Sequence, residues 1–207
     1  GVKGICSFQE ANQPVQDEKP SKEAKPAETP AAPEIPAEQQ VEGGHMDAIF
    51  TRIDSRLIHG QVASSWAKIV KCDAIFAISD DVAKDELRAK LLLQVAPAHL
   101  QAYVISVDKA IKVWHNPMYA DRKVLWLVTK PGDIVRLIEG GVDIKQVNVG
   151  GMTHREGCKL ISQAVAVDAD DVAAFQRLNE LGVKMTLQQL ATSPAEDVMP
   201  KLASVKF

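Results

Sequence analysis

The chain has 207 residues and a formal net charge of −3 at neutral pH, so no broad basic surface indicates a nucleic-acid binder. It contains no apolar run as long as a membrane span, and its three cysteines are too scattered for a zinc site or a disulfide framework. The composition therefore favours a globular protein whose thiols stay reduced, as in the cytoplasm.

Residues 9–45 differ in composition from the remainder of the chain. They are rich in Ala, Pro and Glu, and six of the eleven prolines lie between Pro14 and Pro36. Residues 1–45 carry four lysines against eight acids, which leaves residues 46–207 with a net charge of about +1. Such a segment buries too little apolar surface to offset its ordering entropy. We expect a disordered acidic linker over residues 9–45 and one domain over residues 46–207.

The first half of this domain alternates apolar runs of strand length with patterns of helical period. In chain order, the pattern predicts a strand over 48–53, a helix across 62–69, a strand over 74–78, a helix from residue 80, a strand over 102–105 and a helix over 106–114. The first helix has an apolar face made of Val62, Trp66 and Ile69. The second has one made of Leu87, Leu91 and Val95.

The second half repeats the alternation. The pattern predicts a strand over 124–128, a helix from residue 131, a strand over 146–149, a short strand within 159–167, a helix over 168–181 and a last strand over 184–189. Continuously apolar strands indicate a sheet that is covered on both faces. Strands separated by helices indicate right-handed crossovers. We therefore predict an α/β fold with three layers, in which helices cover both faces of a mostly parallel central sheet.

Residues 52–62 are the best candidate for a functional site. They read RIDSRLIHGQV and place two arginines, an aspartate and a histidine within eight positions at the end of the first strand. Guanidinium groups bind phosphate oxygens in bidentate geometry, and a neutral imidazole is a nucleophile near pH 7. Residues 150–155 follow a later strand and belong to the same edge of a parallel sheet, where ligands bind. The run therefore predicts phosphoryl chemistry at His59.

Each of these residues also has a plainer interpretation. Charged residues at a strand end are often only solvated, and Arg56 can form a structural ion pair with Asp54. Asp54 can equally serve as a loop-stabilising acceptor. A non-catalytic module that binds an anion or acts as a sensor is a second class of function. A nucleotide-binding Rossmann protein is disfavoured, because no Gly-x-Gly-x-x-Gly motif follows the first strand.

The run RIDSRLIHGQV resembles the active-site signature of the IIB component in the mannose/fructose/sorbose family of the bacterial phosphoenolpyruvate-dependent sugar phosphotransferase system. Four further strings are similar to family motifs in the same order: QVAP at 94–97, NPMYAD at 116–121, VNVGGM at 147–152 and AVAVD at 164–168. The resemblance covers about residues 46–200. Mannose-type proteins join a IIA domain to IIB through an Ala/Pro-rich tether, so residues 1–8 are expected to be the tail of a truncated IIA domain.

The resemblance implies a chemical role for each residue of the signature. His59 matches the histidine that is phosphorylated on Nδ1. It would accept a phosphoryl group from a IIA domain and pass it to a sugar held by the membrane components IIC and IID, without a metal or another cofactor. Arg52 and Arg56 would neutralise the phosphoryl oxygens, and Asp54 would orient either His59 or an arginine.

The resemblance also implies the surroundings of the site. Backbone N–H groups near Gly60 and Gln61 would bind the phosphoryl group, and Gly60 would let the donor domain approach closely. Ser55 stands where many members carry an acid or an amide, and His154 stands where an aromatic residue is common. Both are expected at the edge of the site. The implied location is the cytoplasmic face of the membrane through IIC and IID, and the resemblance allows a homodimer.

Overall fold

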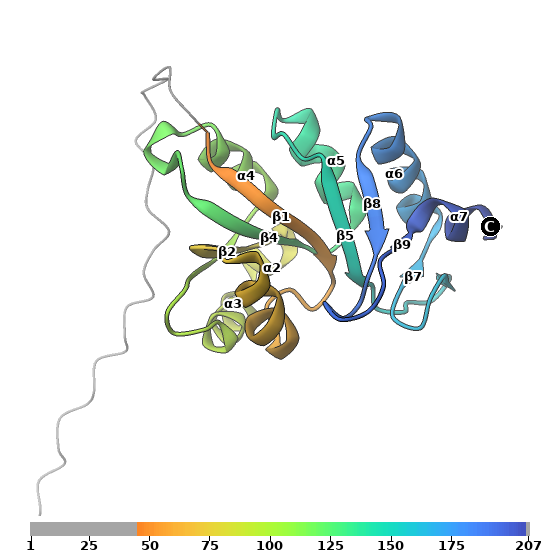
Figure 1. Cartoon of the computed structure of the whole chain (residues 1–207), viewed down its shortest axis with the longest axis horizontal. Helices are drawn as coiled ribbons and strands as arrows, with labels where there is room; N and C mark the ends of the chain where they lie inside the picture. Colours follow the sequence, from red (N-terminus) through yellow and green to blue (C-terminus); the bar gives the residue numbers. More distant parts are fainter. Residues whose placement is uncertain (1–44, 206–207) are drawn as a thin grey trace, which may run out of the picture. The chain divides into compact units, whose positions relative to one another are not determined.

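The computed structural model describes residues 45–205. The expected IIA tail at 1–8 and nearly all of the expected linker at 9–45 lie outside the described residues. Within the described part, the chain forms a seven-stranded sheet of order β3-β2-β4-β1-β5-β8-β9 (Figure 1). Neighbouring strands are parallel except β8 and β9. The predicted α/β fold with a mostly parallel sheet is confirmed.

The sheet strands are β1 (Asp47–Asp54), β2 (Ala74–Ile78), β3 (Gln101–Ile105), β4 (Lys123–Val128), β5 (Gln146–Gly151), β8 (Lys184–Leu187) and β9 (Glu196–Asp197). A separate antiparallel pair consists of β6 (Lys159–Leu160) and β7 (Ala166–Val167). The helices are η1 (Val62–Trp66), α1 (Ala67–Val70), α2 (Asp80–Lys84), α3 (Glu86–Val95), α4 (Val107–Trp114), η2 (Pro117–Tyr119), α5 (Pro131–Glu139), α6 (Ala169–Glu180) and α7 (Val198–Ala203).

Side-chain caps fix where several helices begin. Ser79, Asp85 and Ser106 each accept a hydrogen bond from the backbone N–H three residues later, at the starts of α2, α3 and α4. Asp168 and Asp171 form a reciprocal capping box at the start of α6. Because these signals are local in the sequence, the predicted helix starts at 106 and 168 agree with the structure.

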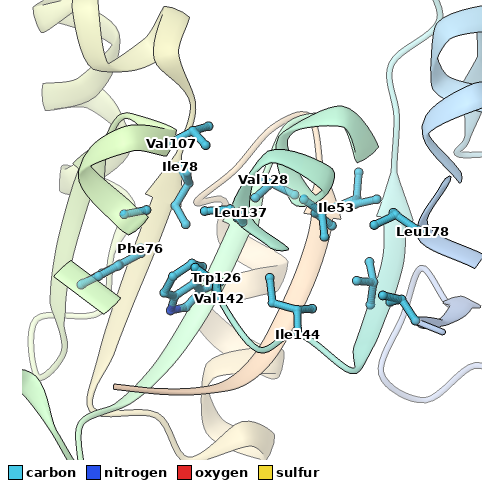
Figure 2. Close-up of a cluster of buried hydrophobic side chains, with 14 of the residues drawn as sticks. Ile53, Phe76, Ile78, Val107, Trp126, Val128, Leu137, Val142, Ile144 and Leu178 are labelled. Carbon is cyan, nitrogen blue, oxygen red and sulfur yellow. The ribbon is translucent and has the colours of Figure 1, made fainter. Parts of the chain in front are cut away.

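The sheet is covered on both faces, as its continuously apolar strands predict. Alternate residues of a strand point to opposite faces, so β4 supplies Trp126 and Val128 to one cluster and Leu125 and Leu127 to the other. All four side chains have no exposed surface. Figure 2 shows Trp126 and Val128 beside Leu137 of α5 in the first cluster.

The connections between strands divide the helices between the two faces. Buried residues of α4, α5 and α6 belong to the Trp126 cluster, whereas those of η1, α1 and α2 belong to the Leu125 cluster. The connections from β1 to β2 to β3 therefore use one face, and those from β3 to β4, β5 and β8 use the other. The connection that leaves β1 therefore covers one face of the sheet, whereas the connections that leave its neighbours β4 and β5 cover the other face. A crevice at the carboxyl ends of strands is expected at such switch points.

The predicted helix from residue 80 is wrong as a single element. Asp85 has an extended backbone, and its side chain caps a second helix, so α2 ends and α3 begins there. The expected apolar face of α3 points to solvent, because Leu87, Leu91 and Val95 are 70%, 55% and 45% exposed. The strand that α3 contacts, β3, is the edge of the sheet, so no further strand lies beyond it.

Two further expectations need correction. Ile69 is 60% exposed and does not share the buried face of Val62 and Trp66. It lies in α1, which ends at Lys71 in a left-handed conformation. The strand predicted over 184–189 ends at Leu187 and is not the last strand, since β9 follows it. Val198 and Leu202 of α7 are buried in the same cluster as Trp126, which explains why this end of the described chain is folded.

Candidate functional site

The signature run leaves β1 through a tight turn. The Leu57 N–H donates to the Asp54 carbonyl at 2.8 Å, and the Ser55 N–H donates to the Gly151 carbonyl of β5 at 2.9 Å. Leu57 has a left-handed backbone with φ of 56°, which costs a non-glycine residue about 1–2 kcal/mol. The side chains of Leu57 and Ile58 are buried, at 0% and 2% exposure, and anchor the turn in the core. Strain of this kind in a buried turn is typical of functional sites.

Asp54 is the centre of the site. It has no exposed surface, and its two carboxylate oxygens accept four hydrogen bonds. One comes from Arg52 Nη2 at 3.1 Å, and three come from the Arg56 backbone N, Nε and Nη2 at 3.2, 3.0 and 3.1 Å. His59 Nε2 lies 3.6 Å from Asp54 Oδ2. A buried carboxylate is thus surrounded by two guanidinium groups and one imidazole.

The Arg52 side chain has no exposed surface. Its guanidinium is fully buried and donates to the Asn148 side chain and to the carbonyls of Gln188 and Gln189 at 3.0 and 3.1 Å. Its Cζ also lies 4.8 Å from the centroid of the Trp66 ring. Burial lowers the pKa of Arg52, and the neighbouring Asp54 carboxylate opposes that shift. Arg52 therefore connects the ends of β1, β5 and β8 and balances the charge of Asp54.

Gly150 explains how a guanidinium fits between two strands. A Cβ at this position would overlap the Cζ and both terminal nitrogens of Arg52. Gly150 and Gly151 are the last two residues of β5. At Gly151 a Cβ would meet Asp54 Oδ1 at 3.5 Å and Arg56 Nη2 at 3.6 Å, which are ordinary contacts. The first glycine is thus required for packing against Arg52, and the second is not.

The two ring nitrogens of His59 have different environments. Nδ1 lies 2.9 Å from the Leu57 carbonyl, which can only accept, so Nδ1 carries a proton in this arrangement. Nε2 is enclosed and has no hydrogen-bond partner among residues 45–205, and it faces the Asp54 carboxylate. The side chain as a whole is 17% exposed. The two nitrogens thus differ, because Nδ1 bonds to a backbone carbonyl and Nε2 is enclosed beside a carboxylate.

The residues after His59 begin a helical run. The His59 carbonyl accepts from the Ala63 N–H at 2.9 Å, so the first N–H groups of the run have no partner within the helix. Gly60 is exposed and Gln61 is half-buried, and a Cβ at Gly60 would meet nothing within 4 Å. The run continues as η1, a π-helix, which is a rare form that is frequent at functional sites.

The two residues expected at the site edge differ in position. The Ser55 hydroxyl lies 2.7 Å from the Thr153 hydroxyl and accepts from the Thr153 N–H at 3.1 Å, which joins the turn to the loop after β5. His154 is exposed, and within the described part of the chain it makes no hydrogen bond or ion pair. The structure thus brings Arg52, Asp54, Ser55, Arg56 and His59 together, and within residues 45–205 it shows no hydrogen bond or ion pair between them and His154.

Several residues of the site were not found from the sequence. Asn148 is a buried polar residue in an otherwise apolar strand, and that contrast was an available signal. Gln188 and Gln189 bind Arg52 through their backbone carbonyls, and Leu57 contributes a carbonyl in a left-handed turn. The type of a residue does not reveal whether its backbone carbonyl will bind a distant side chain.

Across residues 45–205, no group of three or more His, Cys, Asp or Glu side chains is arranged to hold a metal ion. In the same residues, no helix is both long and apolar enough to cross a membrane.

Comparison with known proteins agrees with this geometry. Residues 48–207 match the family model described as the PTS system sorbose subfamily IIB component. The chain is 44% identical over 154 residues to the sorbose-specific EIIB component of Lacticaseibacillus casei, which covers 74% of this chain and 94% of the relative. It is 42% identical over 170 residues to the mannose-specific EIIAB component of Escherichia coli (strain K12), covering 82% of this chain and 53% of the relative. The chain therefore spans about half the length of that longer protein.

A solved structure has the same fold. The crystal structure of the IIBSor domain of the sorbose permease from Klebsiella pneumoniae superimposes with a TM-score of 0.75 at 41% identity. The superposition covers 78% of this chain and 99% of that domain. The resemblance seen in the signature run is thus confirmed over the whole domain, and the chain belongs to the sorbose subfamily of IIB components of the phosphotransferase system.

Proposed function

We propose that His59 is the residue on which this IIB component carries its phosphoryl group, through Nδ1. IIB components of this family take the group from a IIA component and pass it to a sugar. The observation that best supports His59 Nδ1 is the enclosure of Nε2, which faces the Asp54 carboxylate at 3.6 Å. A phosphoryl group at Nε2 would add negative charge beside that carboxylate, whereas Nδ1 lies on the other side of the ring.

The transfer needs a defined tautomer. For attack, Nδ1 must release the Leu57 carbonyl and present a lone pair, while the ring proton resides on Nε2 and faces Asp54. The bond between phosphorus and the donor histidine of IIA breaks as the Nδ1–P bond forms. The proton on Nε2 stays in place, so His59 enters as a neutral imidazole and becomes an imidazolium that carries the phosphoryl group on Nδ1, with its positive charge beside the Asp54 carboxylate. Asp54 thus orients His59 and stabilises the tautomer in which Nδ1 is free.

The two arginines take unequal parts in this proposal. The Arg56 side chain is 50% exposed and binds Asp54 through Nε and Nη2, so its remaining N–H groups are available to phosphoryl oxygens. Arg52 has no exposed surface and acts through Asp54 and the strand ends that it connects. We therefore assign direct charge neutralisation to Arg56 and positioning to Arg52.

The start of the helical run supplies the remaining donors. The N–H groups of Gly60 and Gln61 follow His59 directly, and the first N–H groups of a helix favour anions. In-line phosphoryl transfer depends mainly on positioning and electrostatic stabilisation, which such donors provide. Since a Cβ at Gly60 would meet nothing within this domain, the absence of a side chain matters only where the donor domain approaches.

A label-transfer assay tests the assignment. The protein is incubated with labelled phosphoenolpyruvate, the general phosphotransferase proteins and a IIA domain. We expect acid-labile, alkali-stable label on wild type and none on His59→Ala, while His154→Ala, a matched exposed histidine, is labelled like wild type. Label that persists in His59→Ala would refute the site. A wild type that takes up no label would favour the second class of function, a non-catalytic anion-binding module.

We also propose a domain arrangement and a cellular location for this protein. The Ala/Pro/Glu-rich residues 9–45 and the expected IIA tail at 1–8 support a mannose-type arrangement in which IIA and IIB share one chain. The same proposal places the protein at the cytoplasmic face of the membrane, where IIC and IID hold the sugar. A homodimer is a prediction of the family resemblance alone.

A further inference from the structure

A cavity opens beside the phosphoryl site, at the carboxyl ends of four neighbouring strands. It has a volume of about 360 Å³, within the range of about 300–1,000 Å³ that is usual for small-molecule sites. Its hydroxyl groups follow the strand ends: Ser79 follows β2, Thr129 follows β4, Ser55 follows β1 and Thr153 follows β5. Because the connections change face between β2, β4, β1 and β5, the cavity lies where a switch-point crevice is expected.

The lining of this cavity carries more positive than negative charge. Arg88, Lys130 and Arg155 contribute cations, and Asp81 contributes the one carboxylate. Arg155 is held by Asp168 and Asp171, each at 2.9 Å. Arg88 and Lys130 have no ion-pair partner among residues 45–205. Two cations are therefore available to an anionic ligand, and they come from different walls, α3 and the loop after β4.

The hydroxyl groups complement these charges. Ser55 and Thr153 bond to each other at 2.7 Å, and Thr129 donates to Asp133 at 3.2 Å, so their positions are fixed. Each hydroxyl has a remaining lone pair, and such groups suit ligands that carry hydroxyls of their own. A ring of fixed hydroxyls with two unpaired cations fits a small molecule that combines alcohol groups with a phosphate.

We propose that this cavity binds a phosphate monoester of a sugar. The preference for phosphate rests on Arg88 and Lys130, and the choice of a sugar rests on the four hydroxyls together with the proposed function. The site is separate from the phosphoryl-carrying ring, since neither His59 nor Arg56 lines it. The two sites share the turn after β1, because Ser55 lines the cavity and precedes Arg56.

Binding is tested by a ¹H–¹⁵N NMR titration of the unphosphorylated chain with a hexose 6-phosphate. The free hexose and inorganic phosphate serve as separate arms. We expect saturable shifts at Ser79, Thr129 and Thr153 with the sugar phosphate, and at least tenfold weaker binding in the double variant Arg88→Gln/Lys130→Gln. Lys90→Gln, on the same helix but paired with Glu86, is the matched control and should bind like wild type.

The outcomes separate this proposal from the proposed function. His59→Ala should bind the sugar phosphate as wild type does, whether or not His59 carries the phosphoryl group. Loss of binding in His59→Ala, or unchanged binding in the double variant, would overturn the cavity assignment. Inorganic phosphate that binds as tightly as the ester would also overturn it, because the hydroxyls would then contribute nothing. A failed labelling assay with intact binding would refute only the role of His59.

Discussion

The two glycines at the end of β5 provide a matched test of how Arg52 is packed. In Gly150→Ala the new methyl group would overlap the guanidinium of Arg52, which is held by the Asn148 side chain, two backbone carbonyls and Asp54. Overpacking a core costs about 1–3 kcal/mol, and disturbing hydrogen bonds to a buried charge adds about 1.5–3 kcal/mol. We therefore expect Gly150→Ala to lower the free energy of unfolding by about 2.5–6 kcal/mol.

Gly151→Ala is the control, because its methyl group would meet Asp54 and Arg56 only at ordinary distances of 3.5 and 3.6 Å. Urea unfolding of both variants measures the difference. For a domain of this size, 3 kcal/mol corresponds to a decrease in Tm of about 6–12 °C. The reasoning would be refuted if Gly150→Ala unfolded within about 0.5 kcal/mol of wild type, or if Gly151→Ala were equally destabilised.

Three further changes test other parts of the site and the fold. Gly60→Ala should leave the free energy of unfolding unchanged or raise it by up to about 1 kcal/mol, yet slow phosphoryl transfer from IIA. Urea unfolding measures the first effect and rapid-quench kinetics the second. Transfer at the wild-type rate would show that Gly60 has no part in the mechanism. Arg56→Lys keeps the charge but loses the bidentate pairing with Asp54, so we expect labelling about tenfold or more slower at unchanged Tm, whereas wild-type labelling would count against a direct role. In the folded protein, burial raises the pKa of Asp133 above its ordinary value of 3.8. The protonated carboxyl therefore contributes its full stabilisation below pH 3.8, and this contribution is lost as the pH rises through the raised pKa. Asp133→Asn should therefore be at least as stable as wild type at pH 7 and lose this advantage near pH 3, and a variant less stable at pH 7 would contradict this.

Strands and caps were predictable because their signals are local. The continuous apolar run of β4 indicates burial on both faces, and Asp168 with Asp171 marks the start of α6. The grouping of Arg52, Asp54 and His59 was also readable, since all three stand in one short run. Local signals thus locate the elements and the site.

The unequal roles of the arginines were not predictable. The buried guanidinium of Arg52 donates hydrogen bonds to the Asn148 side chain and to two backbone carbonyls that follow β8. None of these partners is near in sequence. The exposure of Leu87 and Leu91 on α3 likewise depends on β3 being the edge of the sheet, which a helical period does not reveal.

The identity of the phosphorylated nitrogen tests the central claim most directly. The chain is labelled with ¹⁵N in its histidine rings, phosphorylated through IIA and measured by NMR at alkaline pH, where phosphohistidine is stable. We predict a phosphorus–nitrogen coupling at Nδ1 of His59 and none at its Nε2. A coupling at Nε2, or at a ring other than His59, would contradict the arrangement in which Asp54 encloses one nitrogen and leaves the other to react.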